Sequence, residues 1–318
     1  MKHSLKTFVL AFSMLGISSA VVPIAQAQAT SDQNMRIVVV THGEASDPFW
    51  SIVKNGATQA GKDAHVQVDY RAPETFDMVA MSKLIDGAVN QRPAGIVVSI
   101  PDSDALGPSI KRAVAAGIPV ISINAGIDAA PRLGLALHVG QEEIIAGRMV
   151  GQKLKALGGK HALCINQEVG NAALDKRCQG FAQGFGAVTI LPTSTDPSEI
   201  QAKIRAALSS DRSIDTVLAL AALVGEPAVT AVQSAGLAGK VHVASFDLSP
   251  RFLKDVLDGN ADFAVDQQPF LQGYLPVESL AMNARYGTMP VGQVLTGPNL
   301  ITRDKAKRVL DLSAKGLR

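Results

Sequence analysis

The sequence predicts an α/β protein made of two similar lobes, each built on a parallel sheet. Short apolar runs alternate with helical segments along most of the chain, which is typical of parallel strands covered by helices on both faces. The strand–loop–helix pattern of residues 36–62 also recurs at residues 161–184. We interpret this recurrence as two lobes lying side by side.

Apolar runs and the helical segments between them define the expected elements. The predicted strands are residues 36–41, 66–70, 95–100, 120–124, 161–166, 188–191, 216–219, 241–246 and 263–266. The predicted helices are residues 48–62, 78–90, 106–116, 141–157, 172–184, 200–208, 226–235 and 250–257.

Helix-boundary residues agree with these elements. Asp47-Pro48 and Asp196-Pro197 each place a capping acceptor before a proline at the first helical position. Glycines follow three of the predicted helix ends, at Gly117, Gly158 and Gly236. Local signals therefore support the order of elements that the periodicity predicts.

Residues 1–27 resemble a removable export signal. Lys2 and Lys6 precede an apolar stretch at residues 8–22, and residues 25–27 (Ala-Gln-Ala) have the small side chains of a cleavage site. Cleavage after residue 29 fits the same pattern. The apolar part is short and interrupted by serines and a glycine, which argues against a membrane anchor. We expect the mature chain to reach the periplasm.

The charge of the mature chain limits the classes of partner that we expect for it. Removing the leader takes away two lysines, so Lys+Arg falls from 30 to 28 against 28 Asp+Glu, and the mature chain is formally neutral. A neutral chain gives no reason to expect nucleic acid or an acidic membrane as a partner. About 290 residues suits two domains of ordinary size, and we expect a soluble monomer.

Polar and aromatic residues gather directly after the predicted strands. In open parallel sheets the ligand crevice lies beyond the carboxyl ends of the strands, so these positions form the candidate site. They are residues 41–44 (Thr-His-Gly-Glu) and 47–50 (Asp-Pro-Phe-Trp), Pro101-Asp102, Asn124-Ala125, residues 166–168 (Asn-Gln-Glu) with Asn171 and Arg177, Asp247, and residues 266–269 (Asp-Gln-Gln-Pro).

These segments carry a resemblance to a known family. The segments that match in order are residues 47–50, residues 117–121 (Gly-Ile-Pro-Val-Ile), residues 177–181 (Arg-Cys-Gln-Gly-Phe), residues 245–247 (Ser-Phe-Asp) and residues 267–269 (Gln-Gln-Pro). The chain resembles periplasmic solute-binding proteins of the ribose/galactose-binding type, which deliver sugars to ABC transporters. The resemblance covers the whole mature chain.

The resemblance implies two α/β lobes that are joined by a three-segment hinge and close over one ligand. The N-terminal lobe would comprise residues 34–139 and 268–297, and the C-terminal lobe residues 140–267 and 298–318. The ligand would be a sugar or sugar alcohol, and the protein partner a membrane permease of an ABC transporter. No cofactor, metal or catalytic residue is implied.

The resemblance also implies a ligand site with residues from both lobes. Phe49 and Trp50 are the expected aromatic pair, because the C–H faces of a sugar stack on aromatic rings. Planar amide, carboxylate and guanidinium groups suit pairs of neighbouring hydroxyls, which both donate and accept hydrogen bonds. Such groups are expected at Asp47, where the family usually has Asn, and at Asn124, Asn171, Arg177, Asp247, Asp266 and Gln267.

One departure from the family pattern concerns the identity of the ligand. Ribose-type members resemble one another in an Asp-Arg pair after the fourth strand, whereas this chain has Asn124-Ala125. Loss of the charged clamp weakens a ribose assignment and favours a larger sugar, a differently oriented one or an acyclic sugar alcohol. His42, in a first loop longer than usual, is a further candidate contact, and it is equally suited to be a neutral loop residue.

Structural interpretations compete with the binding roles. Phe49 and Trp50 also suit core packing at a helix start. Arg177 also suits an exposed helix face; if it is buried, it needs an acidic partner, for which Asp247 and Asp266 are the candidates. Asp247 also suits a cap for the helix that follows it.

Cys164 and Cys178 are the only cysteines. One lies on a predicted strand and the other on the next helix, and the expected compartment is oxidising, which favours a disulfide. Closing a loop of roughly 14 residues would stabilise the fold by about 3 kcal/mol in the chain-entropy model. Two buried free thiols are the alternative.

Enzyme motifs find little support in the sequence. No G-x-G-x-x-G follows a strand, the glycine-rich residues 158–160 lead into His161 instead of the Ser or Thr of a P-loop, and G-x-S-x-G and H-E-x-x-H are absent. Residues 42–44 (His-Gly-Glu) are too short a cluster for a metal site.

Two other function classes compete with the binding protein. A sugar isomerase or lyase could use His42 with Glu44 or Asp247 as acid and base, and this is the enzyme alternative. The sugar-sensing lobes of a lac-type repressor share the fold, but the leader and the lack of an N-terminal DNA-binding segment argue against that class.

Overall fold

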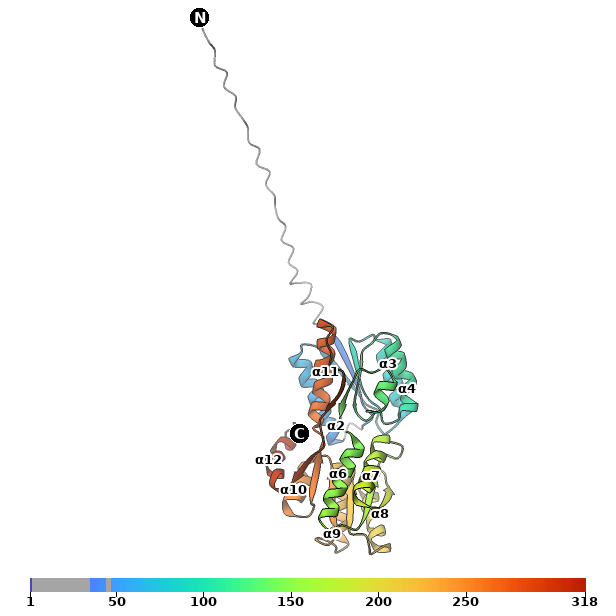
Figure 1. The fold of residues 1–318 in the computed structure, drawn as a ribbon, viewed down its shortest axis with the longest axis vertical. Coiled ribbons are helices and arrows are strands. Elements are labelled where there is room, and N and C mark those ends of the chain that lie inside the picture. Colours follow the sequence, from blue (N-terminus) through green and yellow to red (C-terminus); the bar gives the residue numbers. More distant parts are fainter. Residues whose placement is uncertain (2–34, 44–46) are drawn as a thin grey trace.

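The computed structural model describes Met1, residues 35–43 and residues 47–318. Apart from Met1, the predicted export signal at residues 1–27 lies outside the described residues, as does Glu44. The described chain forms two lobes, which Figure 1 shows one above the other, and each lobe holds one six-stranded sheet. The predicted α/β class with two lobes is confirmed.

The first sheet has the strand order β11-β5-β4-β3-β1-β2, and every strand pair in it is parallel. Its strands are β1 (Arg36–Val40), β2 (Gln67–Arg71), β3 (Gly95–Ser99), β4 (Val120–Asn124), β5 (Leu137–Gly140) and β11 (Gly292–Leu295). The helices of this lobe are α2 (Pro48–Asp63), α3 (Met78–Asn90), α4 (Ser103–Ala115), α5 (Ala129–Arg132) and α11 (Pro269–Tyr286).

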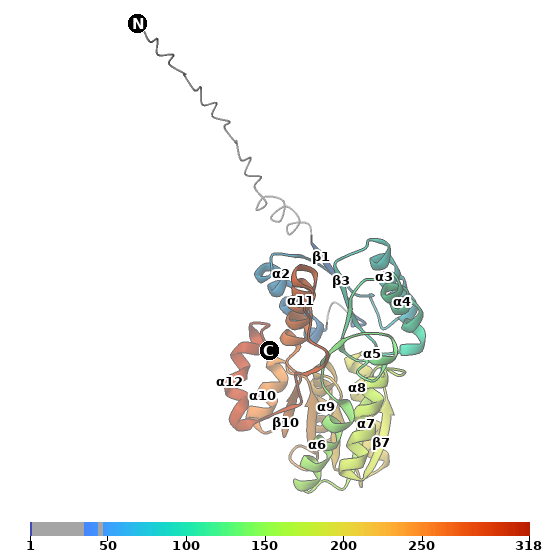
Figure 2. The same ribbon diagram turned by 45° about the horizontal axis from the view of Figure 1, so that its top comes forward.

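Helices cover both faces of the first sheet. Alternate residues of β1 face opposite sides, so Ile37 and Val39 pack in the cluster with α2 and α11, while Val38 and Val40 pack with α3 and α4. Figures 1 and 2 both show α2 beside α11 and α3 beside α4. Burial on both faces explains why the inner strands β1, β3 and β4 are almost continuously apolar.

The second sheet has the order β12-β10-β9-β8-β6-β7. Its strands are β6 (His161–Asn166), β7 (Ala187–Pro192), β8 (Thr216–Ala219), β9 (His242–Phe246), β10 (Phe263–Asp266) and β12 (Asn299–Thr302). The helices of this lobe are α6 (Glu143–Ala156), α7 (Ala172–Phe185), α8 (Pro197–Ser210), α9 (Ala222–Ser234), α10 (Pro250–Asp258) and α12 (Arg303–Ala314). β12 runs antiparallel to β10, so this sheet is parallel except at one edge.

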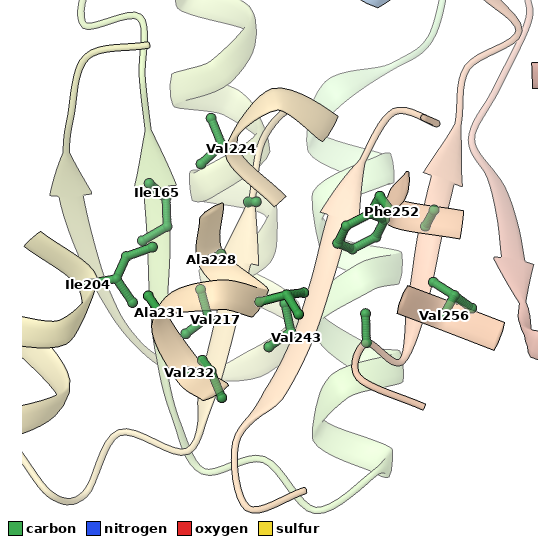
Figure 3. Packing of buried hydrophobic residues seen from close by; sticks show 14 of the residues in the cluster. Ile165, Ile204, Val217, Val224, Ala228, Ala231, Val232, Val243, Phe252 and Val256 are labelled. Atoms are coloured by element: carbon green, nitrogen blue, oxygen red, sulfur yellow. The ribbon is translucent and has the colours of Figure 1, made fainter. Parts of the chain in front are cut away.

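The largest hydrophobic cluster lies under one face of the second sheet. Figure 3 shows Val217 and Val243 of the sheet against Ile204 of α8, Val224 of α9 and Phe252 of α10. All five side chains are fully buried. Because this packing orders β6, β8 and β9 side by side, it also orders the loops that follow them.

All nine predicted strands are present, but several later elements were not predicted. β5, β11 and β12 are short, and most of β11 is exposed, so they lack a long apolar run. The long helix α11 was missed because Gly273 and Pro276 interrupt its helical pattern. Gly273 is needed for packing, since a Cβ there would lie 1.9 Å from the carbonyl oxygen of Val53 on α2.

The chain passes between the two sheets three times, between β5 and α6, between β10 and α11, and between β11 and β12. Hydrogen bonds tie these segments together. The Thr296 N–H donates to the Gly140 carbonyl at 2.7 Å, and Gln268 Nε2 donates to the Thr296 carbonyl at 2.6 Å. Asn299 Nδ2 donates to the Asp266 carbonyl at 3.3 Å. The three crossings therefore form one hydrogen-bonded strap behind the space between the lobes.

The predicted disulfide is present. Cys164 on β6 is bonded to Cys178 on α7, and both residues are buried in the core of the second lobe. Because Cys178 follows Arg177 directly, the bond fixes the middle of α7, where Arg177 lies, against the sheet. No free cysteine occurs in the described chain.

Helices α6 and α7 approach each other closely because glycines face across their contact. A Cβ on Gly147 would lie 2.2 Å from the carbonyl oxygen of Arg177, and one on Gly180 would lie 2.2 Å from that of Ile144. Both distances are far inside van der Waals contact. The glycines therefore set how far α6 stands from the helix that carries Arg177.

Gly147→Ala should destabilise the protein although alanine is the better helix former. We expect a loss of about 1–3 kcal/mol, because the new methyl group must push α6 away from α7. Gly87→Ala on α3 is the matched control, since its Cβ would meet only Arg71 Nη1 at 3.7 Å. The control should gain about 0.5–1 kcal/mol from helix propensity. Urea denaturation measures the free energy of unfolding of both variants. An equal change in this free energy in the two variants would contradict the packing argument.

Candidate ligand-binding site

A cleft lies where the carboxyl ends of the strands in both sheets meet. It encloses about 320 Å³ of empty space, part of it open to solvent. Its lining residues are His42, Asp47, Phe49, Trp50, Asn124, Gln167, Glu168, Asn171, Leu174, Arg177, Leu220, Ala221, Asp247 and Gln267. Nine of the ten predicted site residues are in this set, and Asp266 is not.

Aromatic rings form one wall of the cleft. Phe49 and Trp50, in the first turn of α2, meet edge to face with ring centroids 5.0 Å apart. The His42 ring also meets Trp50 edge-on at 4.7 Å. Both aromatic residues are less than a tenth exposed and belong to the core cluster of the first lobe. Core packing and cleft lining are therefore compatible roles for this pair.

His42 is held as a neutral ring. Its backbone N–H donates to Ser99 Oγ at 3.0 Å, and its Nδ1 lies 2.7 Å from the same hydroxyl. Burial lowers the pKa of His42 to about 3, and the positive charge of Arg177 adds to this effect. Nε2 faces the second lobe, 3.4 Å from Asn171 Nδ2. The interpretation of His42 as a neutral hydrogen-bonding residue is therefore supported.

Two site residues are helix caps. The Asp47 side chain accepts from the Phe49 N–H at 2.9 Å at the start of α2, and Asn171 Oδ1 accepts from the Ala173 N–H at 3.0 Å at the start of α7. Asn171 Nδ2 also donates to Glu168 Oε2 at 2.7 Å. Capping fixes where each side chain stands relative to the strand end before it.

Arg177 is buried, and its partner is a residue that the sequence did not indicate. Nε donates to Glu143 Oε2 at 2.6 Å and Nη2 to Glu143 Oε1 at 3.0 Å, with both side chains only 3% exposed. The prediction of Asp247 or Asp266 as the direct ion-pair partner is therefore wrong. Glu143 is the first residue of α6, and the close packing of α6 on α7 brings it within reach.

The remaining donors of Arg177 reach into the site. Nη1 donates to the Leu220 carbonyl at 3.1 Å and Nη2 to Gln267 Oε1 at 3.3 Å. The guanidinium carbon also lies 4.6 Å from the ring centroid of Phe246. A guanidinium has five N–H groups, so these bonds leave one Nη1 N–H available to a ligand. Burial opposes the charge, but Glu143 outweighs it and the pKa of Arg177 is raised.

Gln267 joins the two lobes at the back of the cleft. Its Nε2 donates to Asp247 Oδ1 at 2.5 Å, and its Oε1 accepts from Asn124 Nδ2 at 3.4 Å. Asn124 ends β4 in the first lobe, while Asp247 follows β9 in the second. One amide therefore holds a polar residue from each lobe.

Asn124 and Asp247 occupy equivalent strained positions. Their φ angles are 59° and 66°, in the left-handed region that costs a residue with a side chain. This backbone turns each side chain into the cleft at the end of the fourth parallel strand of its lobe. Asp247 does not cap the following helix, which is one of the roles that the sequence allowed. The cap of α10 is Ser249, whose Oγ accepts from the Phe252 N–H.

Asp247 is a buried carboxyl group with a raised pKa. Burial raises the pKa to about 7, and the negative charges of Asp47 and Glu143 act in the same direction. Arg177 and the hydrogen bond from Gln267 oppose this shift. Asp247 therefore holds its proton to a higher pH in the folded protein than in the unfolded chain.

Asp266 lies outside the cleft, contrary to its predicted role there. Its carboxylate accepts from the Gln268 N–H at 2.7 Å and from Arg318 Nε at 2.6 Å. The side chain is completely buried. Successive strand residues point to opposite faces, so Gln267 and Asp266 cannot both enter the same space. Asp266 instead anchors the C-terminal residues beside the crossings.

Gln167, Glu168, Leu174, Leu220 and Ala221 also line the cleft and are not among the ten predicted site residues. Gln167 and Glu168 directly follow β6, so the strand-end rule had pointed to their segment. Leu220 and Ala221 follow β8 in the same way, but their apolar side chains have no polar group that would indicate ligand binding. Leu174 is recognisable only from the packing of α7.

Metal-binding clusters and membrane-spanning helices are absent from the described residues. Three or more His, Cys, Asp or Glu side chains do not gather there in a way that could hold a metal ion. None of the helices in residues 35–43 and 47–318 is long and apolar enough to cross a membrane.

Comparison with known proteins assigns the fold to a family. The model of the periplasmic binding protein domain matches residues 37–288. The chain belongs to the periplasmic binding protein family. Members of this family bind solutes without catalysing a reaction, so the enzyme alternative is not retained.

Individual relatives agree with this assignment. A carbohydrate transporter from Acidothermus cellulolyticus, solved in complex with myo-inositol, is 36% identical and superimposes with a TM-score of 0.85 over 90% of this chain and 100% of that chain. The D-ribose/D-allose-binding protein of Pseudomonas aeruginosa is 25% identical over 95% of this chain and 99% of that protein. The xylose/arabinose-binding protein of Sulfolobus acidocaldarius is 26% identical over 78% of this chain, which spans 66% of that protein.

Proposed function

We propose that this periplasmic binding protein captures a sugar or sugar alcohol in the cleft between its lobes and delivers it to the membrane permease of an ABC transporter. The observation that carries the proposal is the convergence of aromatic, carboxylate, amide and guanidinium groups from both lobes on one small cleft. Rings suit C–H faces, and the planar polar groups suit neighbouring hydroxyls. The relative with bound myo-inositol supports a polyhydroxylated ligand.

Contacts between the lobes support a closing motion about the crossings. The Ala172 N–H, at the start of α7, donates to the Pro101 carbonyl of the first lobe at 3.0 Å, and Lys176 pairs with Asp128 across the same junction. A ligand that touches both lobes stabilises this arrangement only by its extra affinity for it. Delivery then requires that the permease bind the closed form in preference to the open one.

The proposed closing motion requires a boundary between the two lobes. We assign residues 34–139 and 268–297 to the N-terminal lobe, and residues 140–267 and 298–318 to the C-terminal lobe. The sheet order supports these limits, since β11 joins the first sheet and β12 the second. Export through a cleaved signal at residues 1–27 and a monomeric state belong to the same proposal.

A thermal-shift screen of the mature protein tests the function. The panel comprises pentoses, hexoses, their sugar alcohols and inositols. A ligand that binds only the folded protein stabilises it by RT ln(1 + [L]/Kd), so a micromolar ligand at millimolar concentration adds roughly 4 kcal/mol. A hit that calorimetry confirms supports the proposal. Silence across the panel with a folded protein would overturn it.

Trp50→Leu should weaken the binding of the identified ligand while leaving the protein folded. Trp50 is the only tryptophan, and its ring contacts both Phe49 and His42 in the cleft wall. Leucine keeps an apolar side chain but loses the ring face, so we expect affinity to fall about tenfold. Tyr286→Leu on the exposed end of α11 is the matched control and should bind like wild type. Unchanged affinity in Trp50→Leu would remove this residue from the site.

A further inference from the structure

Gln272 lies behind the cleft and reaches it only through Gln267. It stands near the start of α11, is completely buried, and is not one of the residues that line the cleft. Its Nε2 donates to the backbone carbonyl of Gln267 at 3.1 Å. The side chain of Gln267 in turn joins Asn124 of the first lobe to Asp247 of the second. Gln272 therefore supports the residue that joins the lobes.

The same amide group holds a second crossing. Gln272 Nε2 also donates to Thr296 Oγ1 at 3.2 Å, so both N–H groups of the amide have an acceptor. Thr296 belongs to the crossing between β11 and β12, and its N–H and Oγ1 both donate to the Gly140 carbonyl, at 2.7 and 3.2 Å. Gly140 ends β5 at the remaining crossing. One side chain thus connects all three crossings, two directly and one through Thr296.

The start of α11 is fixed to the first lobe by its packing on α2. A Cβ on Gly56 of α2 would lie 2.0 Å from the carbonyl oxygen of Phe270, and one on Gly273 would lie 1.9 Å from that of Val53. Backbones in such close contact cannot slide past each other without breaking the packing. Gln272, next to Gly273, is therefore a fixed point of the first lobe from which the crossings are held.

The crossing at Gln267 needs support from its surroundings. The next residue, Gln268, has a φ of 52°, in the left-handed region that a residue with a side chain keeps only when its neighbours hold it there. Its N–H donates to Asp266 Oδ1 at 2.7 Å and its Nε2 to the Thr296 carbonyl at 2.6 Å. Gln272 adds a hydrogen bond to the carbonyl directly before this residue. These bonds together fix how the Gln267 peptide is oriented and where its side chain enters the cleft.

We propose that Gln272 is a positioning residue of the hinge. It fixes Gln267 to the first lobe, and so it limits the range of lobe orientations and sets the ligand affinity of the cleft without touching the ligand. This inference rests on the proposed function, because it concerns the closing of the same cleft. It adds that a residue outside the cleft couples the lobes.

Distances between the lobes test this role without a ligand. Spin labels are attached to Lys62→Cys on α2 and Arg205→Cys on α8, two exposed positions in different lobes of a chain whose described residues include no free cysteine. Pulsed electron double resonance on the ligand-free mature protein then gives the distribution of interlobe distances. Gln272→Met keeps a side chain of similar length but removes both donors, so we expect a broader distribution than in the wild type. A distribution equal to that of the wild type would overturn the inference.

Two further variants separate positioning from general stability. Ser109→Ala removes a completely buried hydroxyl that hydrogen-bonds Ser82 Oγ at 2.7 Å inside the first lobe, so it should lower stability and leave the distribution unchanged. Equal broadening in Ser109→Ala and Gln272→Met would contradict a specific role. Thr296→Val removes one of the two acceptors of Gln272 and should broaden the distribution less than Gln272→Met does. If Gln272→Met does not fold, an unchanged distribution in Thr296→Val overturns the inference.

Ligand affinity gives the second readout. Calorimetry with myo-inositol, D-ribose and D-glucitol measures binding to the wild type, Gln272→Met and Ser109→Ala. For a probe that the wild type binds, Gln272→Met should bind about tenfold more weakly, because Gln267 is no longer held in place, and Ser109→Ala should bind like the wild type. Equal affinity in the wild type and Gln272→Met would overturn the effect on the cleft and leave the proposed function intact. If the wild type binds no sugar or polyol, the proposed function fails, and the ligand-free distances still decide the role of Gln272 in the hinge.

Discussion

Arg177→Ala is expected to destabilise the fold by about 3–5 kcal/mol, because it leaves the carboxylate of Glu143 buried without its cation. Both side chains are 3% exposed and share two short hydrogen bonds, so water cannot replace the guanidinium without opening the core. The same substitution removes the donor to Gln267 and the remaining Nη1 N–H from the cleft. Ligand affinity should fall about ten- to a hundredfold.

A double substitution separates the two effects. Arg177→Met combined with Glu143→Gln replaces the buried ion pair by neutral groups of similar length, so most of the lost stability should return. Affinity should stay low, since the guanidinium is still missing. Urea denaturation and calorimetry give the two readouts. Wild-type affinity in the double variant would show that Arg177 does not contact the ligand.

An exposed ion pair is the matched control for Arg177. Arg112 donates to Asp86 Oδ1 through Nε at 3.2 Å and Nη2 at 2.6 Å, but the two side chains are 55% and 38% exposed. Arg112→Ala should cost less than about 1 kcal/mol, because solvent screens such a pair. A similar loss in both alanine variants would contradict the argument from burial.

Asp247→Asn should stabilise the ligand-free protein at high pH. The pKa of Asp247 is raised from 3.8 to about 7 by burial, so the folded state binds the proton more tightly than the unfolded state does. The stability that protonation contributes is complete below 3.8 and is lost as the pH rises through about 7. At about 1.4 kcal/mol for each pKa unit, the wild type loses roughly 4 kcal/mol across that range through this group.

Asparagine removes this titration but keeps an oxygen that can accept from Gln267. The variant and the wild type should be similarly stable near pH 4, and the variant should be more stable by several kcal/mol near pH 8. Its ligand affinity near pH 8, where wild-type Asp247 is ionised, should fall about tenfold, because a neutral amide accepts a weaker hydrogen bond than a carboxylate. The gain in stability and the loss of binding would together identify Asp247 as a strained functional residue.

Urea denaturation at the two pH values measures the difference between variant and wild type. Other titrating groups, including His42, are common to both proteins, so their contributions cancel in this difference. Asp258→Asn, on the exposed side of α10, is the control and should show no gain that depends on pH. A variant less stable than the wild type at high pH would contradict the raised pKa.

Residues at the strand ends could be predicted because parallel sheets place them by rule. Phe49 and Asn124 follow apolar runs that are visible in the sequence, and all carboxyl ends of a parallel sheet lie at one edge. Resemblance to a family then indicated which of these residues face a ligand. Strands β11 and β12 gave no such signal, because each is only four residues long and lacks a long apolar run.

The hydrogen-bond and ion-pair partners of the buried polar residues could not be predicted in the same way. Glu143 lies 34 positions from Arg177, and only the glycine contacts between α6 and α7 bring the two together. Asp266 and Gln267 are neighbours in sequence, yet the alternation of strand side chains sends one toward Arg318 and the other into the cleft. The left-handed backbone of Asp247 likewise became visible only in the fold.

The sequence by itself determined the α/β class, the two-lobe repeat, the family and most of the residues around the cleft. These depend on hydrophobic period, helix caps and strand ends, all of which act over a few residues. Only the tertiary structure decided that Glu143 neutralises Arg177 and that Gln267 joins the lobes. These outcomes depend on contacts between segments far apart in the chain, and no local pattern encodes them.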